Sequence, residues 1–231
     1  SGTSMSCPHV SGVAAAVKSR NPSWGPSAIR SAIVTTATQT NNAKAALTLD
    51  SGPAATPYDY GAGEVSPAAA LRPGLVYEAG TQDYLLFLCN YGYEAAQIKL
   101  VARSLPEGFE CPKNGSADAI SDLNYPSIAV SGFDGKGSRA VSRALTNVGE
   151  DEEAEYVASV ESPKELVVQV APEKLQFTKG NKKVGYRVTF SSAAASSSSS
   201  SPLQGDFFGS ITWSNGNYRV RSPFVVSTWK R

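Results

Sequence analysis

Residues 1–12 read SGTSMSCPHVSG, and the helix that they open decides how the first part of the chain folds. From Ser4 to about Arg20 the sequence is rich in small apolar residues on nearly every side, which predicts a buried helix. A serine at the start of a helix has free backbone N–H groups and the positive end of the helix dipole beside its hydroxyl. Both can stabilise an oxyanion, and Gly2 lets a substrate approach the backbone. Ser4 is therefore a candidate nucleophile, with an ordinary N-cap as the alternative.

Proline and glycine residues predict where the next helices begin and end. Asn21-Pro22 ends the first helix, and Gly25-Pro26 opens a second that continues to about Ala37. Polar and small residues predict a loop over 38–57, and the apolar run 83–89 predicts a short helix. Several prolines and glycines between residues 105 and 122 predict a linker.

Beyond Leu123 the sequence changes to short alternating runs separated by turns, as in a β-sandwich or small barrel. In one such run Tyr186, Val188 and Phe190 share a face, and Arg187 and Thr189 share the other. These faces predict a strand with one side in a core.

Asn215-Gly216 predicts a β-hairpin with a two-residue type I′ turn, because this dipeptide accepts positive φ at both positions. In that register one face carries two facing pairs, Trp213 with Tyr218 and Ile211 with Val220.

Residues 191–201 read SSAAASSSSSS. Two interpretations stay open for this run. Small polar residues predict a flexible loop, since they bury too little to offset their ordering entropy. The abrupt break in the strand pattern equally suits letters that stand for unidentified side chains, so the run carries no function.

Composition places the chain among ordinary globular proteins. Its 231 residues are 41% hydrophobic and 18% charged, with a net charge of +1. Such a balance recruits neither nucleic acid nor an anionic membrane, and no apolar stretch approaches the ~20 residues that cross a bilayer. With three cysteines and His9 as the single histidine, a structural zinc site is not expected, nor is any other metal or cofactor. The chain opens at Ser1 without a leader, which suggests a fragment of a longer protein.

Cys7, Cys89 and Cys111 allow one disulfide with one free thiol, or three reduced thiols, and their count does not choose between these states. The sequon Asn114-Gly115-Ser116 gives weak support for a secreted chain with a glycan on Asn114.

The run GTSMSCPHVSG, followed by NPSWGPSAIRSAIVTTA, resembles the nucleophile segment of subtilisin-like serine proteases. Three later stretches are similar to plant subtilases of the cucumisin-like type: YGAGEVSPAAALRPGLVYEAGTQDYLLFLCNYGY, LNYPSIAV and FGSITWSNGNYRVRSPFVV. The chain departs from the usual family pattern at a few positions, namely Glu64, Ser66, Arg72, Ala144 and Leu145.

This resemblance implies the C-terminal part of an α/β subtilisin-like domain over residues 1–108, mainly helical, then a linker over 109–122. An all-β fibronectin III-like sandwich over 123–231 would follow. It implies that Ser4 is the nucleophile of a secreted serine endopeptidase, in the apoplast or a latex-like fluid, that acts on peptide or protein substrates. The backbone N–H of Ser4 and the Thr3 hydroxyl would bind the oxyanion. A disulfide between Cys89 and Cys111 is also predicted, with Cys7 as a buried thiol, because cysteines on apolar helices usually pack inward.

A catalytic triad cannot be completed within this chain. His9 follows Ser4 by five residues on one helix, about 140° around and about 7.5 Å along the axis, which is beyond hydrogen-bond reach. Subtilisin-like enzymes carry their triad in the order Asp, His, Ser. The Asp and the His are therefore expected from an N-terminal portion of the same protease, without which this chain should be inactive. A homodimer is a further possible assembly.

Two alternative functions compete with this one. A serine esterase would show GxSxG, but Ser6 stands where the second glycine belongs. A non-catalytic interaction module is the other, because a sandwich fold does not dictate function. Exposure of Phe207, Phe208 and Trp229 as one patch would favour it, whereas inward packing would favour a structural sandwich.

Overall fold

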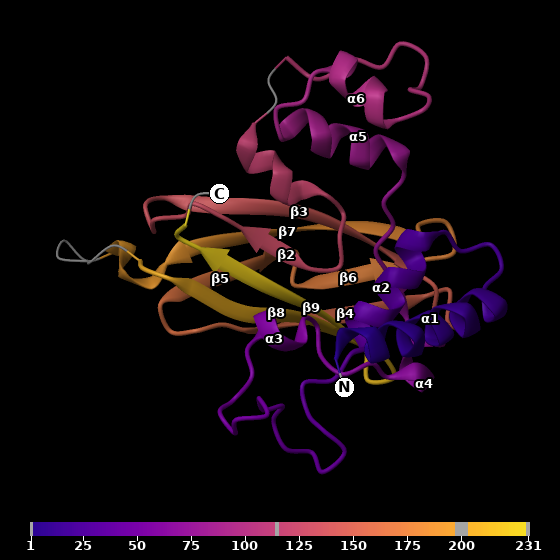
Figure 1. Cartoon of the computed structure of the whole chain (residues 1–231), viewed down its shortest axis with the longest axis vertical. Coiled ribbons are helices and arrows are strands. Elements are labelled where there is room, and N and C mark those ends of the chain that lie inside the picture. The colour runs from indigo at the N-terminus through magenta and orange to yellow at the C-terminus, as the bar shows by residue number, and fades with distance from the viewer. Residues whose placement is uncertain (1, 114–115, 197–202, 230–231) are drawn as a thin grey trace.

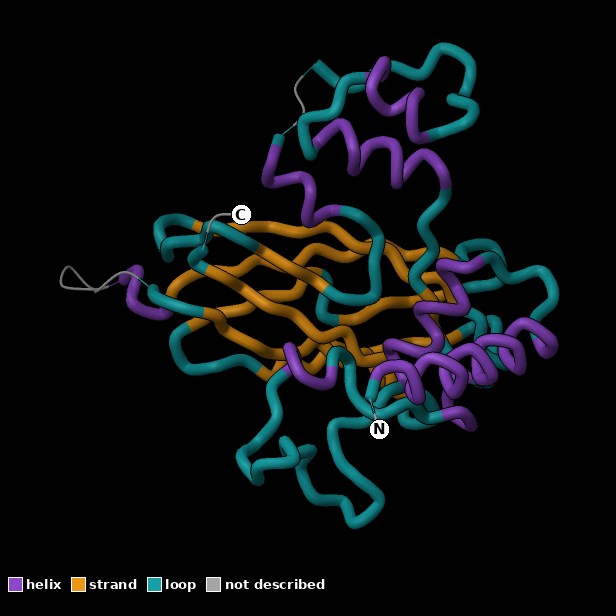
Figure 2. The backbone as a smooth tube through the Cα atoms, in the orientation of Figure 1, coloured by secondary structure: helices purple, strands orange, loops and turns teal. Residues whose placement is uncertain are grey.

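A computed structural model describes residues 2–113, 116–196 and 203–229. Two β-sheets stack face to face in the middle of the molecule, and helices lie at one end of the stack and above it (Figures 1 and 2). A long loop after the second helix extends away from the sheets on the other side (Figure 2).

The sheets hold four and five strands. The first has the order β1-β3-β7-β5 and the second the order β2-β9-β8-β4-β6. Only β2 and β9 pair in parallel among the described strand pairs. The strands are β1 (Leu75–Val76), β2 (Ile128–Val130), β3 (Ser138–Asn147), β4 (Ala154–Glu161), β5 (Leu166–Ala171), β6 (Lys174–Phe177), β7 (Lys183–Ser192), β8 (Asp206–Ser214) and β9 (Arg219–Ser227).

Alternating burial places one face of each sheet in a shared core. In β7, Tyr186, Val188 and Phe190 are almost fully buried, while Arg187 is exposed and Thr189 half-buried. The predicted faces of this strand are therefore confirmed. Across the core, aromatic pairs such as Phe190 with Phe224 meet edge to face, with ring centroids 5.2 Å apart.

The β8–β9 hairpin exists, but its predicted turn is wrong. Trp213 pairs with Val220 rather than with Tyr218, so the loop is two residues longer than a type I′ turn. The Asn215 side chain explains this, because its Oδ1 accepts the N–H groups of Asn217 (3.1 Å) and Tyr218 (2.9 Å). Since the register shifts by two residues, Ile211, Trp213 and Val220 still share the core face, and all are fully buried.

The helices begin close to where proline and glycine predict. Helix α1 covers Thr3–Arg20 and α2 covers Pro26–Thr36, with Pro26 in the first turn. Four shorter helices follow: α3 (Pro57–Tyr60), α4 (Pro67–Ala70), α5 (Thr81–Asn90) and α6 (Ala95–Val101). Residues 37–56 form a long loop with isolated bridges, so a mainly helical first part is not confirmed.

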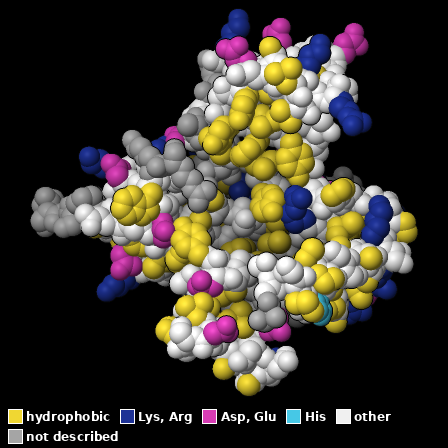
Figure 3. Space-filling model, viewed as in Figure 1, with side chains coloured by type: hydrophobic (Ala, Val, Ile, Leu, Met, Phe, Trp, Pro, Cys, Tyr) yellow, Lys and Arg dark blue, Asp and Glu magenta, His cyan; other side chains and the backbone are white. Residues whose placement is uncertain are grey.

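Helix α1 is not buried, so that prediction is wrong. Val17 is its one fully buried residue, and it packs with Ala32 and Ala70 near the C-terminal end of the helix. Towards the N-terminus, Met5 is 58% exposed and Val10 is 40% exposed. Figure 3 shows hydrophobic side chains exposed beside the single histidine. Among the described elements, α2 and α4 make the main contacts with α1.

The serine-rich run is partly ordered. Ser191 and Ser192 extend β7, and a short 3₁₀ helix, η2 (Ala193–Ser196), follows them. A loop was expected over these residues, but Leu166 and Val167 of β5 pair with Ser192 and Ser191. The rest of the predicted flexible loop, 197–201, lies outside the described residues.

Tyr77 joins the helical part of the chain to both sheets. Its hydroxyl lies 2.6 Å from the Tyr186 hydroxyl on β7 and 2.7 Å from the Ser222 hydroxyl on β9. Its backbone N–H donates to Ser31 Oγ of α2 at 2.8 Å. Burial raises the pKa of both tyrosines, so both hydroxyls keep their protons at neutral pH. The strand just before Tyr77, β1, also pairs with β3, although it belongs to the segment assigned to the protease domain.

Arg143 fixes the chain that enters the sandwich. Its guanidinium is buried and donates to the backbone oxygens of Tyr125 (3.0 Å), Ser121 (2.6 Å) and Ser127 (3.2 Å). Burial lowers the pKa of Arg143 from its usual value, although the group stays charged near neutrality. The end of the predicted linker, which includes the 3₁₀ helix η1 (Ala117–Asp122), is therefore held against β3.

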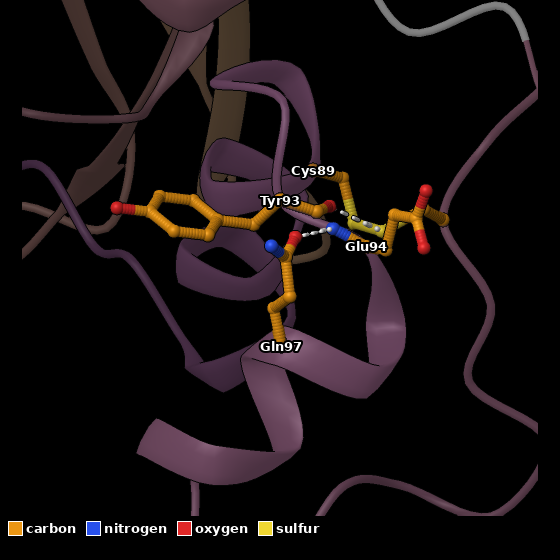
Figure 4. The surroundings of a disulfide bond; sticks show 5 residues. Cys89, Tyr93, Glu94 and Gln97 are labelled. Carbon is orange, nitrogen blue, oxygen red and sulfur yellow. Dashed lines mark hydrogen bonds between the residues drawn. A yellow bond between two sulfur atoms is a disulfide. The ribbon is translucent and has the colours of Figure 1, made fainter.

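A disulfide holds α5 and the segment after α6 together. Cys89 on α5 is bonded to Cys111, with the Cα atoms 5.5 Å apart. Leu85 and Ile98 form a small core beside it, separate from that of the sandwich. Figure 4 shows the start of α6 next to this bond, where the Glu94 N–H donates to Gln97 Oε1 at 2.9 Å.

Removing this disulfide should loosen the α5–α6 unit and leave the sandwich intact. The bond closes a loop of 22 residues in sequence separation, for which chain entropy predicts a loss of about 3 kcal/mol. Hydrogen exchange should show reduced protection of Leu85 and Ile98 in a Cys89→Ser/Cys111→Ser variant. Cys7→Ser, which removes the free thiol, is the matched control and should change nothing. Equal protection in the double variant and the parent would contradict this.

Candidate active site

Ser4 lies in the first turn of α1, and its side chain is exposed. The helix starts after Gly2, whose φ of +131° is a conformation that side-chain-bearing residues rarely adopt. The Gly2 carbonyl accepts the Met5 N–H at 2.9 Å, which closes the first turn. The fold therefore presents the Ser4 hydroxyl to solvent at the positive end of an 18-residue helix.

The start of α1 leaves backbone N–H groups free near Ser4. In a helix capped at Gly2, the N–H groups of Thr3 and Ser4 have no acceptor within the helix. Gly2 has no side chain, and the position that its Cβ would take has no other atom within 4 Å. An oxyanion could therefore reach these N–H groups without a steric obstacle. The proposed roles of Thr3 and Ser4 stay predictions.

His9 is exposed on α1 and is engaged with its own helix. Its Nδ1 lies 2.7 Å from the Met5 backbone oxygen, one turn earlier. Because a carbonyl oxygen can only accept, Nδ1 must carry the proton in this contact. The ring is thus held along the helix surface, which agrees with a structural role for His9.

Cys7 does not occupy the environment that the sequence predicts. It is a free cysteine and is exposed, whereas an apolar helix suggested burial. The reason is the same as for the rest of α1, because the described residues leave this face of the helix uncovered. The Cys89–Cys111 disulfide leaves Cys7 as the one cysteine with a free thiol. No group of three or more His, Cys, Asp or Glu side chains that could hold a metal ion occurs among the described residues.

The three aromatic residues that would mark an interaction surface do not form one exposed patch. Phe207 packs on the sandwich core, and the Phe208 ring meets Tyr58 edge to face at 4.9 Å. Trp229 alone of the three is largely exposed, at 68%. The glycosylation candidate Asn114 lies outside the described residues. None of the helices in the described ranges combines the length and apolar character that a membrane crossing requires.

Sequence reasoning missed the hydroxyl cluster of Tyr77, Tyr186 and Ser222 and the carbonyl contacts of Arg143. Single tyrosines and arginines in alternating strands carry no signal of this kind. The one hint was Tyr186 on the core face of its strand, since a buried tyrosine hydroxyl needs a partner.

Comparison with known proteins agrees with this geometry. The subtilase family matches residues 1–63, which include α1 and α2, and the fibronectin type-III domain family matches residues 122–226, which include the sandwich from β2 on. The chain is 56% identical over 228 residues to the "CO(2)-response secreted protease" of Arabidopsis thaliana. It is 51% identical to "Subtilisin-like protease SBT5.1" of the same plant and 46% identical to "Subtilisin-like serine-protease S" of Lotus japonicus.

Each of these three alignments covers 99% of this chain and 29% of the relative, so the chain spans less than a third of their length. The subtilase match and all three relatives indicate the same family. The chain belongs to the subtilase family and is similar to plant subtilisin-like proteases along its whole length.

Proposed function

We propose that this chain supplies the nucleophile of a secreted serine endopeptidase, and that Ser4 is that nucleophile. The observation that carries the proposal is the exposed Ser4 hydroxyl in the first turn of α1, inside the segment that matches the subtilase family. The names of the relatives support a protease rather than an esterase.

In the proposed reaction, Ser4 Oγ attacks the carbonyl carbon of a peptide bond while a histidine base takes the hydroxyl proton. The tetrahedral oxyanion then lies against the Ser4 N–H and the Thr3 hydroxyl. Its collapse breaks the C–N bond, the histidine returns the proton to the leaving amine, and water hydrolyses the acyl-enzyme. The substrates are peptides or proteins.

The base and its aspartate come from an N-terminal portion of the same protease. Since His9 donates to a carbonyl of its own helix, it is poorly placed to serve. The exposed apolar face of α1 supports such a partner. Met5 and Val10 leave apolar surface in water next to Ser4, and covering it is favourable by about 25 cal/mol per Å². The portion that covers this face would bring the histidine beside the serine.

A fluorophosphonate probe tests this proposal directly. Ser4 should be labelled when the chain is part of the complete protease and not when the 231-residue chain is alone, because a hydroxyl without its base is a poor nucleophile. Mass spectrometry of the labelled peptide identifies the modified residue. Denatured complete protease is the control and should not react. Labelling of any residue other than Ser4 would refute the assignment.

Location outside the cell, in the apoplast or a latex-like fluid, belongs to the same proposal. One relative is named as a secreted protease, and a disulfide suits an oxidising compartment. Passage through a secretory route should leave a glycan on Asn114, so treatment with an N-glycosidase should lower the mass of the native protein. An Asn114→Gln variant from the same host should show no such change. An unchanged mass for the native protein would contradict the prediction.

A further inference from the structure

A cavity of about 750 Å³ lies between the α5–η1 region and one end of the sandwich. Residues from α5, η1, β2, β3, β8 and β9 line it, so segments far apart in sequence converge there. Figure 3 shows hydrophobic side chains gathered over α5 above this hollow. The volume falls within the range of about 300–1,000 Å³ that is usual for ligand sites. None of the residues that line the cavity belongs to α1, the helix that carries Ser4.

Aromatic rings form both walls of the cavity. Phe87 on α5 and Tyr91, directly after the end of this helix, have ring centroids 6.3 Å apart, and Tyr91 is 62% exposed. Trp229 comes from the sandwich side and is exposed, yet its backbone is fixed. Its N–H donates to Ser227 Oγ at 3.2 Å, and its oxygen accepts the Gly132 N–H at 3.0 Å. An exposed aromatic ring on a fixed backbone can bury apolar surface against a ligand without first ordering the chain.

One carboxylate in the cavity has no ion-pair partner among the residues that the structure describes. Among the charged side chains that line it in the described residues, Asp118 forms an ion pair with Arg139, which leaves Asp206. Asp206 Oδ1 is buried and finds no hydrogen-bond partner among the described residues. Asp206 as a whole is half-buried, and no basic side chain of the described residues forms an ion pair with it, so its carboxylate brings an unneutralised charge to the cavity.

These observations specify the ligand. The described residues of the lining carry a net negative charge, from Asp118 and Asp206 against Arg139, and aromatic faces attract cations. A metal ion does not fit, because no cluster of three or more ligating side chains occurs in the described residues. We propose that this cavity binds a short polypeptide segment of a partner protein through a basic side chain. The lysine or arginine pairs with Asp206, and its apolar neighbours pack on Phe87, Tyr91 and Trp229.

Calorimetric titration of the 231-residue chain with acetyl-Leu-Arg-Leu-amide tests the proposal. Versions with Gln or Glu in place of Arg report the contribution of the charge. The Arg peptide should bind saturably and about tenfold or more tightly than the Gln peptide, with an affinity that falls as salt rises. Asp206→Asn keeps the shape of the side chain and should remove the preference for Arg. Trp229→Ala should weaken the binding of the Arg peptide and the Gln peptide alike.

Matched controls lie outside the cavity. Asp134→Asn removes an exposed carboxylate, and Leu100→Ala removes a side chain that is 88% exposed on α6, so neither should change binding. Circular dichroism verifies that each variant is folded, and Trp229→Phe, which keeps a ring, should retain most of the affinity. Equal affinity for the Arg, Gln and Glu peptides, or no binding, would overturn the proposal. So would a stable dimer of this chain that Trp229→Ala dissociates, since a second copy would then be the occupant.

Discussion

Replacing Ser4 by alanine in the complete protease should lower turnover by about 10⁶-fold, the loss seen when the nucleophile of subtilisin is removed. The expected cause is loss of acyl-enzyme formation, because no other hydroxyl replaces an attacking oxygen in the same geometry. The fall should appear in kcat, while KM changes little, since Ser4 contributes to the transition state rather than to ground-state binding. Steady-state hydrolysis of a peptide substrate measures both.

Ser11→Ala is the matched control for this variant. Ser11 lies on the same helix and is also exposed, but its hydroxyl donates to the Cys7 backbone oxygen at 3.0 Å, two turns from the helix start. Its removal should leave turnover within a few-fold of the parent, as is usual for surface changes away from special features. Peptide hydrolysis that survives Ser4→Ala, or falls equally in both variants, would remove Ser4 from the role of nucleophile.

Local signals predicted the helices well, because they act over a few residues. Asn21-Pro22 and Gly25-Pro26 fix where α1 ends and α2 begins, whatever packs around them. Burial of α1 was mispredicted because it depends on what covers the helix, not on its composition. The same apolar pattern serves a covered helix and an uncovered one, so Cys7 and Met5 are exposed here.

The β8–β9 hairpin shows the limit of a dipeptide rule. Asn-Gly predicts where the chain turns, and it turns there, but the side chain of Asn215 binds two backbone N–H groups beyond the glycine and lengthens the loop. The predicted burial of the strand residues is nevertheless correct, because a shift of two residues returns each side chain to the same face. Patterns of burial were therefore more robust than the register itself.

The candidate sites differ in the same way. Ser4 could be found from sequence, since the residues that make it informative are adjacent to it in the chain. The cavity beside Trp229 could not, since its walls come from α5 and from the last strand, and only folding brings Phe87 near Asp206. From sequence alone, Trp229 is an isolated apolar residue, and only the fold shows that it faces the aromatic residues of the α5 side across a cavity.

Trp213→Ala should destabilise the sandwich by about 4 kcal/mol, the usual cost of emptying a fully buried tryptophan site. Trp213 is 0% exposed near the C-terminal end of β8, it pairs with Val220 across the hairpin, and its ring meets Tyr186 edge to face at 5.0 Å. The variant loses the buried ring and leaves a cavity between the sheets, next to the hydroxyl cluster that joins them to α2. A shift in the urea midpoint, followed by far-ultraviolet circular dichroism, measures the change.

Trp229→Ala makes the same chemical change where the ring is 68% exposed, so it should alter stability by about 0.5 kcal/mol or less. The pair of variants therefore separates two uses of tryptophan within one sandwich. One ring stabilises the core and contacts no ligand, whereas the other adds little to stability and is held at the rim of a cavity. If the two substitutions cost the same, the β8–β9 hairpin would not be the centre of the core. The exposed ring would then belong to the structure rather than to a binding surface, because an unliganded site has no reason to lose stability when its contact residue is removed.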